Sequence, residues 1–202
     1  GKKIGYIFQE PGRSFDPLQN IGNAFLETFK NSNPNISKEE ALKKAEALLS
    51  EVGIPDPESR LKNFPHQFSG GQLQRIGIAL ALAQDCELVI ADEPTTALDV
   101  TIQAQIVSLL LRLKEERNLS VIFISHNINL VSEISDRILV MYRGCVVETG
   151  TAKNVMTNAV HPYTKALIAS VPEFGTHYTK EKMAFISDEM RDTFPLSGEN
   201  NE

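Results

Sequence analysis

The chain has 202 residues, of which 42% are hydrophobic, so it can form one domain, or one domain with an appendage, around a real core. Its formal net charge is −6 with both signs interspersed, which argues against a basic surface for nucleic acid phosphates. No apolar run reaches the length of a membrane span, no signal peptide is visible, and the distant Cys86 and Cys145 lack metal-ligand spacing, so the composition is typical of a cytosolic protein with reduced thiols.

Lys3 to Phe8 is predicted to be a short strand, because bulky apolar residues alternate along it. Gln9 follows this strand, and its amide oxygen could ligate Mg²⁺ or hold a water molecule. Taken alone, a glutamine at this place is more often part of a surface turn. The chain begins with Gly1 instead of Met, so we expect its start to be processed or truncated.

A helical insertion is predicted next. Ile21 to Phe29 has apolar residues at four-residue steps, which indicates a short helix. Ser37, with Glu40 three residues later, is a capping-box pattern that begins a second helix, and Gly53 ends it. The stretch from Ile21 to about Gln67 therefore interrupts the alternation of strands and helices, and we interpret it as a subdomain.

Ser69, Gly70, Gly71 and Gln72 begin another helix, which extends the helical subdomain to about residue 83. Ser69 and Gln72 form a second capping-box pattern, so a good helix start is one interpretation. Two glycines in the first turn weaken a helix by about 1 kcal/mol each, and they allow another group to approach the backbone closely. Bare N–H groups at a helix start bind phosphate, which is the other interpretation.

The stretch from Glu87 to Pro94 contains four consecutive apolar residues, which is typical of a strand buried on both faces of a parallel sheet. Asp92 and Glu93 follow, and ligands of open parallel sheets lie at the carboxyl ends of the strands. We therefore expect both carboxylates to project into a crevice, one toward Mg²⁺ and the other toward an attacking water. A strand that merely ends in polar residues is an equally good interpretation of this stretch alone.

A helix is predicted from about Thr101 to Arg117, followed by a buried strand from Leu119 to Ser125. His126 comes directly after that strand. Because one crossover helix joins the two strands, they should be parallel, and His126 should open into the same crevice as Glu93.

The rest of the chain is predicted to contain short elements: helices and one hairpin about Arg143-Gly144, in the ranges 127–135, 136–149, 151–157 and 162–169. Apolar density falls from Glu173 onward. We expect a C-terminal extension over residues 173–202, partly disordered, with disorder at Glu199 to Glu202.

In this order and spacing, the motifs resemble those of the ATP-binding subunit of ABC transporters over about Lys3 to Pro172. The residues that carry the resemblance are Gln9 (Q-loop), Ser69, Gly70, Gly71 and Gln72 (signature motif, with Phe68 where Leu is usual), Leu88 to Asp92 (Walker B), Glu93 (catalytic glutamate), Asp99 (D-loop) and His126 (switch histidine). Gln9-Glu10-Pro11, Leu98 to Thr101 and His161 to Leu167 are similar to the oligopeptide, dipeptide and nickel importers. Because no cysteine follows Cys145, an iron–sulfur site is not supported.

The sequence departs from the family in one respect. It contains no Gly-x-x-x-x-Gly-Lys-Ser/Thr stretch, the Walker A loop that cradles phosphates upstream of the Q-loop in this family. The chain therefore looks like the C-terminal part, residues 1–172, of a nucleotide-binding domain. We expect one edge of its sheet to be exposed.

The resemblance implies an α/β fold: a partial P-loop NTPase (RecA-like) parallel sheet with an inserted α-helical ABC subdomain. It implies ATP and Mg²⁺ as cofactors, with Gln9 and Asp92 near the metal, and Ser69 to Gln72 against the γ-phosphate held by a partner. The implied partners are a second ATPase subunit and a transmembrane permease at the cytoplasmic face of the membrane, where the chain would be peripheral. Two alternatives stay open: a soluble ABC ATPase acting on ribosomes or DNA, and a non-enzymatic remnant that only binds partners.

Overall fold

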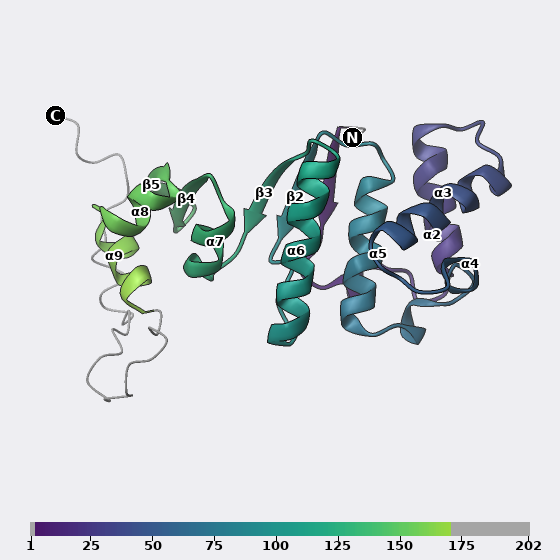
Figure 1. Cartoon of the computed structure of the whole chain (residues 1–202), viewed down its shortest axis with the longest axis horizontal. Coiled ribbons are helices and arrows are strands. Elements are labelled where there is room, and N and C mark those ends of the chain that lie inside the picture. Colours follow the sequence, from purple (N-terminus) through teal and green to yellow (C-terminus); the bar gives the residue numbers. More distant parts are fainter. Residues whose placement is uncertain (1–2, 171–202) are drawn as a thin grey trace. The chain divides into compact units, whose positions relative to one another are not determined.

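A computed structural model describes residues 3–170, and their internal contacts group the chain into two units, Gly1–Ser125 and His126–Glu202 (Figure 1). The predicted extension over residues 173–202, including the disorder expected at its end, lies outside the described residues. The predicted domain of residues 1–172 stays a prediction.

The first unit is built on a parallel sheet of three strands in the order β1 (Ile4–Ile7), β2 (Leu88–Asp92) and β3 (Ser120–Ile124). Ile7 pairs with Ala91, and Asp92 pairs with Ile124, so the carboxyl ends of all three strands meet at one edge. The parallel arrangement predicted for the last two strands is confirmed. The α/β class of the fold is confirmed with it.

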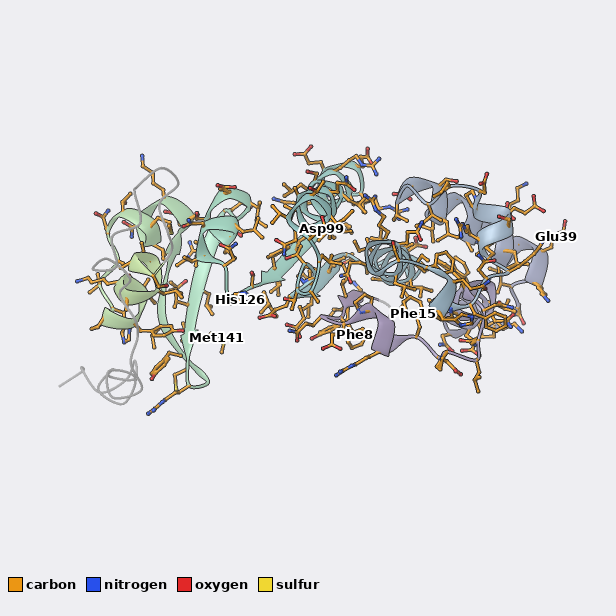
Figure 2. All side chains as sticks on the ribbon, turned by 90° about the horizontal axis from the view of Figure 1, so that it is seen from below. Phe8, Phe15, Glu39, Asp99, His126 and Met141 are labelled. Carbon is orange, nitrogen blue, oxygen red and sulfur yellow. The ribbon has the colours of Figure 1, made fainter. Side chains whose placement is uncertain are left out.

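The prediction that β2 and β3 are buried on both faces is wrong. Val89 and Ala91 are buried, but Ile122 is 49% exposed and Ile124 is 44% exposed. The reason is that α5 (Gly70–Leu82) and α6 (Val100–Glu116) cover one face, whereas the described residues leave the other face open. In Figure 2, Asp99 at the start of α6 and Phe8 beyond β1 lie on opposite sides of this sheet.

The helical insertion contains the two helices that the sequence predicts, α2 (Ile21–Ser32) and α3 (Lys38–Glu51), with small changes at their ends. It also contains two short elements that were not predicted, α4 (Pro57–Arg60) and a 3₁₀ turn, η1 (Pro65–Gln67), and a further short helix that was not predicted, α1 (Pro11–Ser14), precedes it. The Ser37 hydroxyl caps α3 by accepting the Glu40 N–H at 3.1 Å, as predicted. Gly53 follows α3 with a φ of +78°, a left-handed conformation that glycine adopts without strain.

Helix α5 is the central helix of the first unit. It is buried on most sides by the helical insertion, by α6 and by the sheet (Figure 1); its buried residues are Leu73, Gln74, Ile76, Ile78, Ala79, Ala81 and Leu82. The sequence predicts a single apolar stripe, but a helix between two layers needs apolar residues all round. This burial fixes the direction of the Ser69 to Gln72 helix start.

Three arginines tie the C-terminal end of α3 to α5 and α6. Arg75 donates to the carbonyl of Val52 at 2.8 Å, and Arg112 donates to the carbonyl of Glu51 at 2.6 Å. Arg117 makes a two-pronged ion pair with the Glu51 carboxylate at 2.7 and 2.6 Å. Cations suit a helix C-terminus because its last carbonyls carry partial negative charge, so α3 is fastened electrostatically as well as by apolar packing.

The second unit contains a two-stranded antiparallel hairpin, β4 (Arg137–Tyr142) and β5 (Cys145–Thr151), with α7 (Ile128–Ile134), α8 (Ala152–Thr157) and α9 (Pro162–Ala169). The hairpin turn is Arg143-Gly144, as predicted. Both turn residues have positive φ, +49° and +80°, which is the geometry of the favoured two-residue hairpin turn.

Glu148 of β5 joins the hairpin to the segment that begins α9. Its carboxylate accepts the N–H groups of Val160 at 2.8 Å and His161 at 3.1 Å. The buried Thr164 hydroxyl lies near the carboxylate, although no hydrogen bond of standard geometry joins them. Partial burial raises the pKa of this carboxyl group, but the interactions with Thr164, Val160 and His161 outweigh burial and lower the pKa below its ordinary value of 4.5.

We predict that Glu148 makes the second unit sensitive to acid. A lowered pKa stabilises the folded state above the ordinary value of 4.5, and this stabilisation is lost as the pH falls through the folded-state value. Urea unfolding at pH 7 should show Glu148→Gln to be less stable by about 1–3 kcal/mol, and the difference from the parent chain should shrink below pH 4.5. Glu133→Gln, at an exposed position of α7, is the control. A difference independent of pH would contradict the prediction.

Candidate functional site

The candidate site lies where β1 and β2 end. Gln9, two residues beyond β1, donates its side-chain N–H to Oε2 of Glu93, one residue beyond β2, at 2.7 Å. The Thr96 hydroxyl donates to the same oxygen at 2.8 Å. The structure therefore brings together Gln9 and Glu93, which are 84 residues apart in the sequence. Two donors on one oxygen fix the orientation of the Glu93 carboxylate.

The backbone at Glu93 turns sharply out of the sheet. Its φ is +43°, in the left-handed region that residues with a Cβ seldom adopt. The Glu93 N–H donates to the carbonyl of Ile124 in β3 at 3.0 Å, and Pro94 prevents the strand from continuing the ladder. The turn aims the Glu93 side chain back toward Gln9 instead of along the strand.

Tyr6 is a site residue that sequence reasoning missed. Its hydroxyl donates to Oδ2 of Asp92 at 2.7 Å, and this hydrogen bond is the main cause of a raised pKa of Tyr6. The Tyr6 ring contacts Phe8 with the ring centroids 4.7 Å apart. The signal that could have found it is the register: Tyr6 pairs with Ile90, so it shares a face with Asp92 two residues further on.

The helix start at Ser69 has the predicted geometry. The Ser69 hydroxyl accepts the Gln72 N–H at 3.3 Å, and the Gln72 side chain accepts the Ser69 N–H at 3.1 Å. A Cβ added at Gly70 would lie 3.7 Å from Leu98, which is ordinary contact, but one added at Gly71 would lie 2.8 Å from Cγ2 of Ile102. Gly71 therefore has a structural role within the chain: it lets α5 and α6 pack closely.

Asp99 begins α6 as its N-cap, because its carboxylate accepts the Ile102 N–H at 3.0 Å. Gln103, which sequence reasoning also missed, donates from its side chain to the carbonyls of Thr95 and Leu98 at 3.1 and 3.0 Å. The loop between Glu93 and Asp99 is thus attached to α6. The sequence of the helix predicted from Thr101 does not indicate these hydrogen bonds, because their acceptors are backbone carbonyls, which every residue has.

His126 is the first residue of the second unit and follows β3 by two residues. Its predicted place in the crevice beside Glu93 stays a prediction. The same holds for the catalytic and phosphate-binding roles of the residues named above.

The oxygen-rich end of β1 and β2 fits a hard cation such as Mg²⁺. Asp92 supplies carboxylate oxygen, and the amide of Gln9, whose N–H groups face Glu93, supplies carbonyl oxygen. Among residues 3–170 there is no group of three or more His, Cys, Asp or Glu side chains that could hold a metal by itself. An ion at this site would therefore depend on water and phosphate oxygens for most of its ligands.

No helix within the described part of the chain is both long and apolar enough to cross a membrane. Family models match two stretches: the ABC transporter family matches residues 1–96, and the oligopeptide/dipeptide transporter C-terminal region matches residues 147–193.

Similar proteins come from several bacteria. The oligopeptide transport ATP-binding protein OppD of Bacillus subtilis is 51% identical over 173 residues, which is 85% of this chain and 48% of that protein. The dipeptide transport ATP-binding protein DppD of Haemophilus influenzae is 49% identical over 86% of this chain and 52% of that protein. The glutathione import ATP-binding protein GsiA of Escherichia coli is 47% identical over 87% of this chain and 28% of that protein. The chain thus spans about half the length, or less, of the relatives it matches.

Solved structures agree in fold. The ATP-binding cassette MJ0796, determined as a dimer in a post-hydrolysis state with ADP and Pi, superposes with a TM-score of 0.63 at 32% identity, over 74% of this chain and 63% of that one. CbiO1 from Clostridium perfringens, part of the ABC transporter complex cbiONQ, superposes with a TM-score of 0.65 at 28% identity, over 78% of this chain and 60% of that one.

We predict that the two signature glycines respond differently to substitution. Gly71→Ala forces a methyl group against Ile102 and should destabilise the chain by about 1–3 kcal/mol. Gly70→Ala meets only Leu98 at ordinary distance, and it should be neutral or should stabilise the helix by up to about 1 kcal/mol. Chemical denaturation of both variants measures the difference. Adding Ile102→Ala to Gly71→Ala should relieve the clash; equal effects of the two glycine substitutions would contradict this packing.

Proposed function

Because residues 1–96 match the ABC transporter family and residues 147–193 match the oligopeptide/dipeptide transporter C-terminal region, we propose that this chain is part of the ATP-hydrolysing subunit of a peptide importer. The observation that carries the proposal is the 2.7 Å hydrogen bond from Gln9 to Glu93 at the carboxyl ends of two parallel strands. This bond brings the Glu93 carboxylate and the Gln9 amide together at the carboxyl ends of the strands, which is where open parallel sheets bind ligands.

In this proposal Glu93 polarises the attacking water, and its carboxylate is held in orientation by Gln9 and Thr96. Asp92 and Gln9 would hold Mg²⁺, which would supply positive charge to neutralise the phosphates of ATP. Ser69, Gly70, Gly71 and Gln72 would lie against the γ-phosphate of an ATP held by a second subunit, with the N–H groups of Gly70 and Gly71 as donors, because those of Ser69 and Gln72 are used in the capping box. His126 would contact the γ-phosphate, and Asp99, at the position of the family's D-loop, would take part in nucleotide binding. Positioning and charge stabilisation do most of the work.

The partners that we propose are a second ATP-binding subunit and the membrane-embedded permease. The chain would work at the cytoplasmic face of the membrane as a peripheral component. Peptides are the favoured class of substrate because the named relatives are oligopeptide, dipeptide and glutathione transport proteins. Nickel is the runner-up, since His161 to Leu167 is also similar to the nickel importers.

Two other functions compete with this proposal. A soluble ABC ATPase acting on ribosomes or DNA is disfavoured by the net charge of −6 and by the match of residues 147–193 to a transporter-specific region. A non-enzymatic remnant that only binds partners would share the fold. The coding DNA upstream of Gly1 separates the remnant from the proposed ATP-hydrolysing subunit. An in-frame phosphate loop there supports the subunit, and a stop codon supports the remnant.

We predict that Glu93→Gln abolishes hydrolysis by the ATP-hydrolysing subunit that contains this chain, while leaving ATP binding intact. The amide keeps the shape of the side chain but removes the basic oxygen, so turnover should fall at least about 100-fold. Phosphate release and nucleotide binding should be measured in parallel. Glu87→Gln, at the opposite end of β2, is the matched control and should keep the parent rate. Hydrolysis near the parent rate in Glu93→Gln would show that the assignment is wrong.

We also predict that the 202 residues alone bind MgATP no more tightly than about 1 mM, or about −4 kcal/mol, and do not hydrolyse it. Asp92 and Glu93 are anionic and repel a triphosphate unless Mg²⁺ bridges them. The sequence holds no Gly-x-x-x-x-Gly-Lys-Ser/Thr stretch to cradle the phosphates. Calorimetry tests this directly, and micromolar binding would reveal a phosphate site other than those named here.

A further inference from the structure

The loop from Glu93 to Asp99 contains two non-glycine residues with left-handed backbone. The φ of Glu93 is +43°, and the φ of Ala97 is +63°. Residues with a Cβ rarely hold this conformation unless the surrounding structure enforces it. The loop joins two of the proposed site residues, so whatever holds it also sets where they lie.

Two backbone hydrogen bonds join residues of this loop to one another. The Thr96 N–H donates to the Glu93 carbonyl at 3.1 Å, and the Leu98 N–H donates to the Thr95 carbonyl at a long 3.4 Å. From outside, the Gln103 side chain donates to the carbonyls of Thr95 and Leu98 at 3.1 and 3.0 Å. These two carbonyls flank Ala97. A primary amide has two N–H donors, and Gln103 directs both at the strained part of the loop.

Gln103 itself is firmly placed. It lies in the first turn of α6, where its backbone N–H donates to the Asp99 carbonyl at 2.8 Å. Asp99 caps the same turn through Ile102. Further along, α6 buries Ile106 and Leu109 in the core of the first unit. A side chain on a packed helix therefore holds the part of the loop around Ala97, where the backbone hydrogen bond from Leu98 to Thr95 is long.

We propose that Gln103 is a positioning residue for the reaction: its amide clamps the Thr95 and Leu98 carbonyls and thereby fixes the Glu93 carboxylate against Gln9. The clamp acts through Thr96, whose hydroxyl donates to the Oε2 of Glu93 that also accepts from Gln9. Gln103 contacts no reacting atom. Its role in hydrolysis rests on the proposed function of Glu93, but its grip on the loop does not.

The clamp needs donors and no acceptor, and this requirement distinguishes it from a role in helix stability. Gln103→Glu replaces the donating NH₂ group with an anionic oxygen beside two carbonyls, whereas Gln103→Lys keeps N–H donors. A negative side chain near a helix start favours the helix, and a positive one disfavours it. If Gln103 mattered only for helix stability, Gln103→Glu should be better tolerated than Gln103→Lys. If Gln103 holds the loop, Gln103→Lys should be better tolerated than Gln103→Glu.

The experiment is amide hydrogen exchange by NMR on the 202-residue chain, without nucleotide. In Gln103→Glu, the Thr96 and Leu98 amides should exchange at least about tenfold faster, corresponding to about 1.4 kcal/mol in the opening equilibrium. Gln103→Lys should stay within about threefold of the parent. The Gln9 side-chain amide resonance, which reports the bond to Glu93, should shift in Gln103→Glu and keep its position in Gln103→Lys. Ala104→Glu, at the adjacent exposed position, controls for the added charge.

Faster exchange confined to Gln103→Glu, with a shifted Gln9 resonance, supports the clamp. Equal exchange in all variants, or faster exchange in the Lys variant than in the Glu variant, overturns it. If Gln103→Glu does not fold, Gln103→Met, which lacks donors and charge, takes its place with the same expected result. Because neither measurement involves ATP, a failed assignment of Glu93 as the catalytic base would leave these outcomes unchanged.

Discussion

The parallel pairing of β2 with β1 and β3 is the constraint on which the candidate site depends. Ile7 opposite Ala91 brings the residues beyond these two strands together, so Gln9 reaches Glu93 across 84 residues of intervening chain. Because side chains alternate between faces, a slip of one residue would turn Asp92 away from Tyr6. The register of the three strands thus sets both contacts at once.

Close packing of α5 on α6 supplies the second constraint. Gly71 packs against Ile102, and Asp99 caps the helix that carries Ile102, so the helix start at Ser69 and the loop that ends at Asp99 are parts of one packed body. Arg117 and its ion pair with Glu51 attach α3 to the same body from the other side. A motion of the helical insertion would therefore be passed to the loop after Glu93 through these packed contacts.

Element types could be predicted well from the sequence because their signals are local. The Ser37 and Ser69 caps, the Arg143-Gly144 turn and the four-residue spacing in α2 depend on neighbours within one or two turns of chain. The prediction of strands buried on both faces failed for the opposite reason. An apolar run such as Val121 to Ile124 is compatible with burial on one face or on two, and which of these occurs depends on elements far away in the sequence.

By itself, the sequence determined the α/β class, the order of the motifs and the identity of Gln9, Asp92 and Glu93 as site candidates, since strand ends and charged residues can be read from the chain. Only the tertiary structure decided what these residues contact. The contact of Tyr6 with Asp92 and the bonds of the Gln103 amide to two carbonyls have no sequence signature, because the first depends on strand register and the second on backbone carbonyls. Backbone acceptors are common to every residue, and so only three-dimensional proximity selects among them.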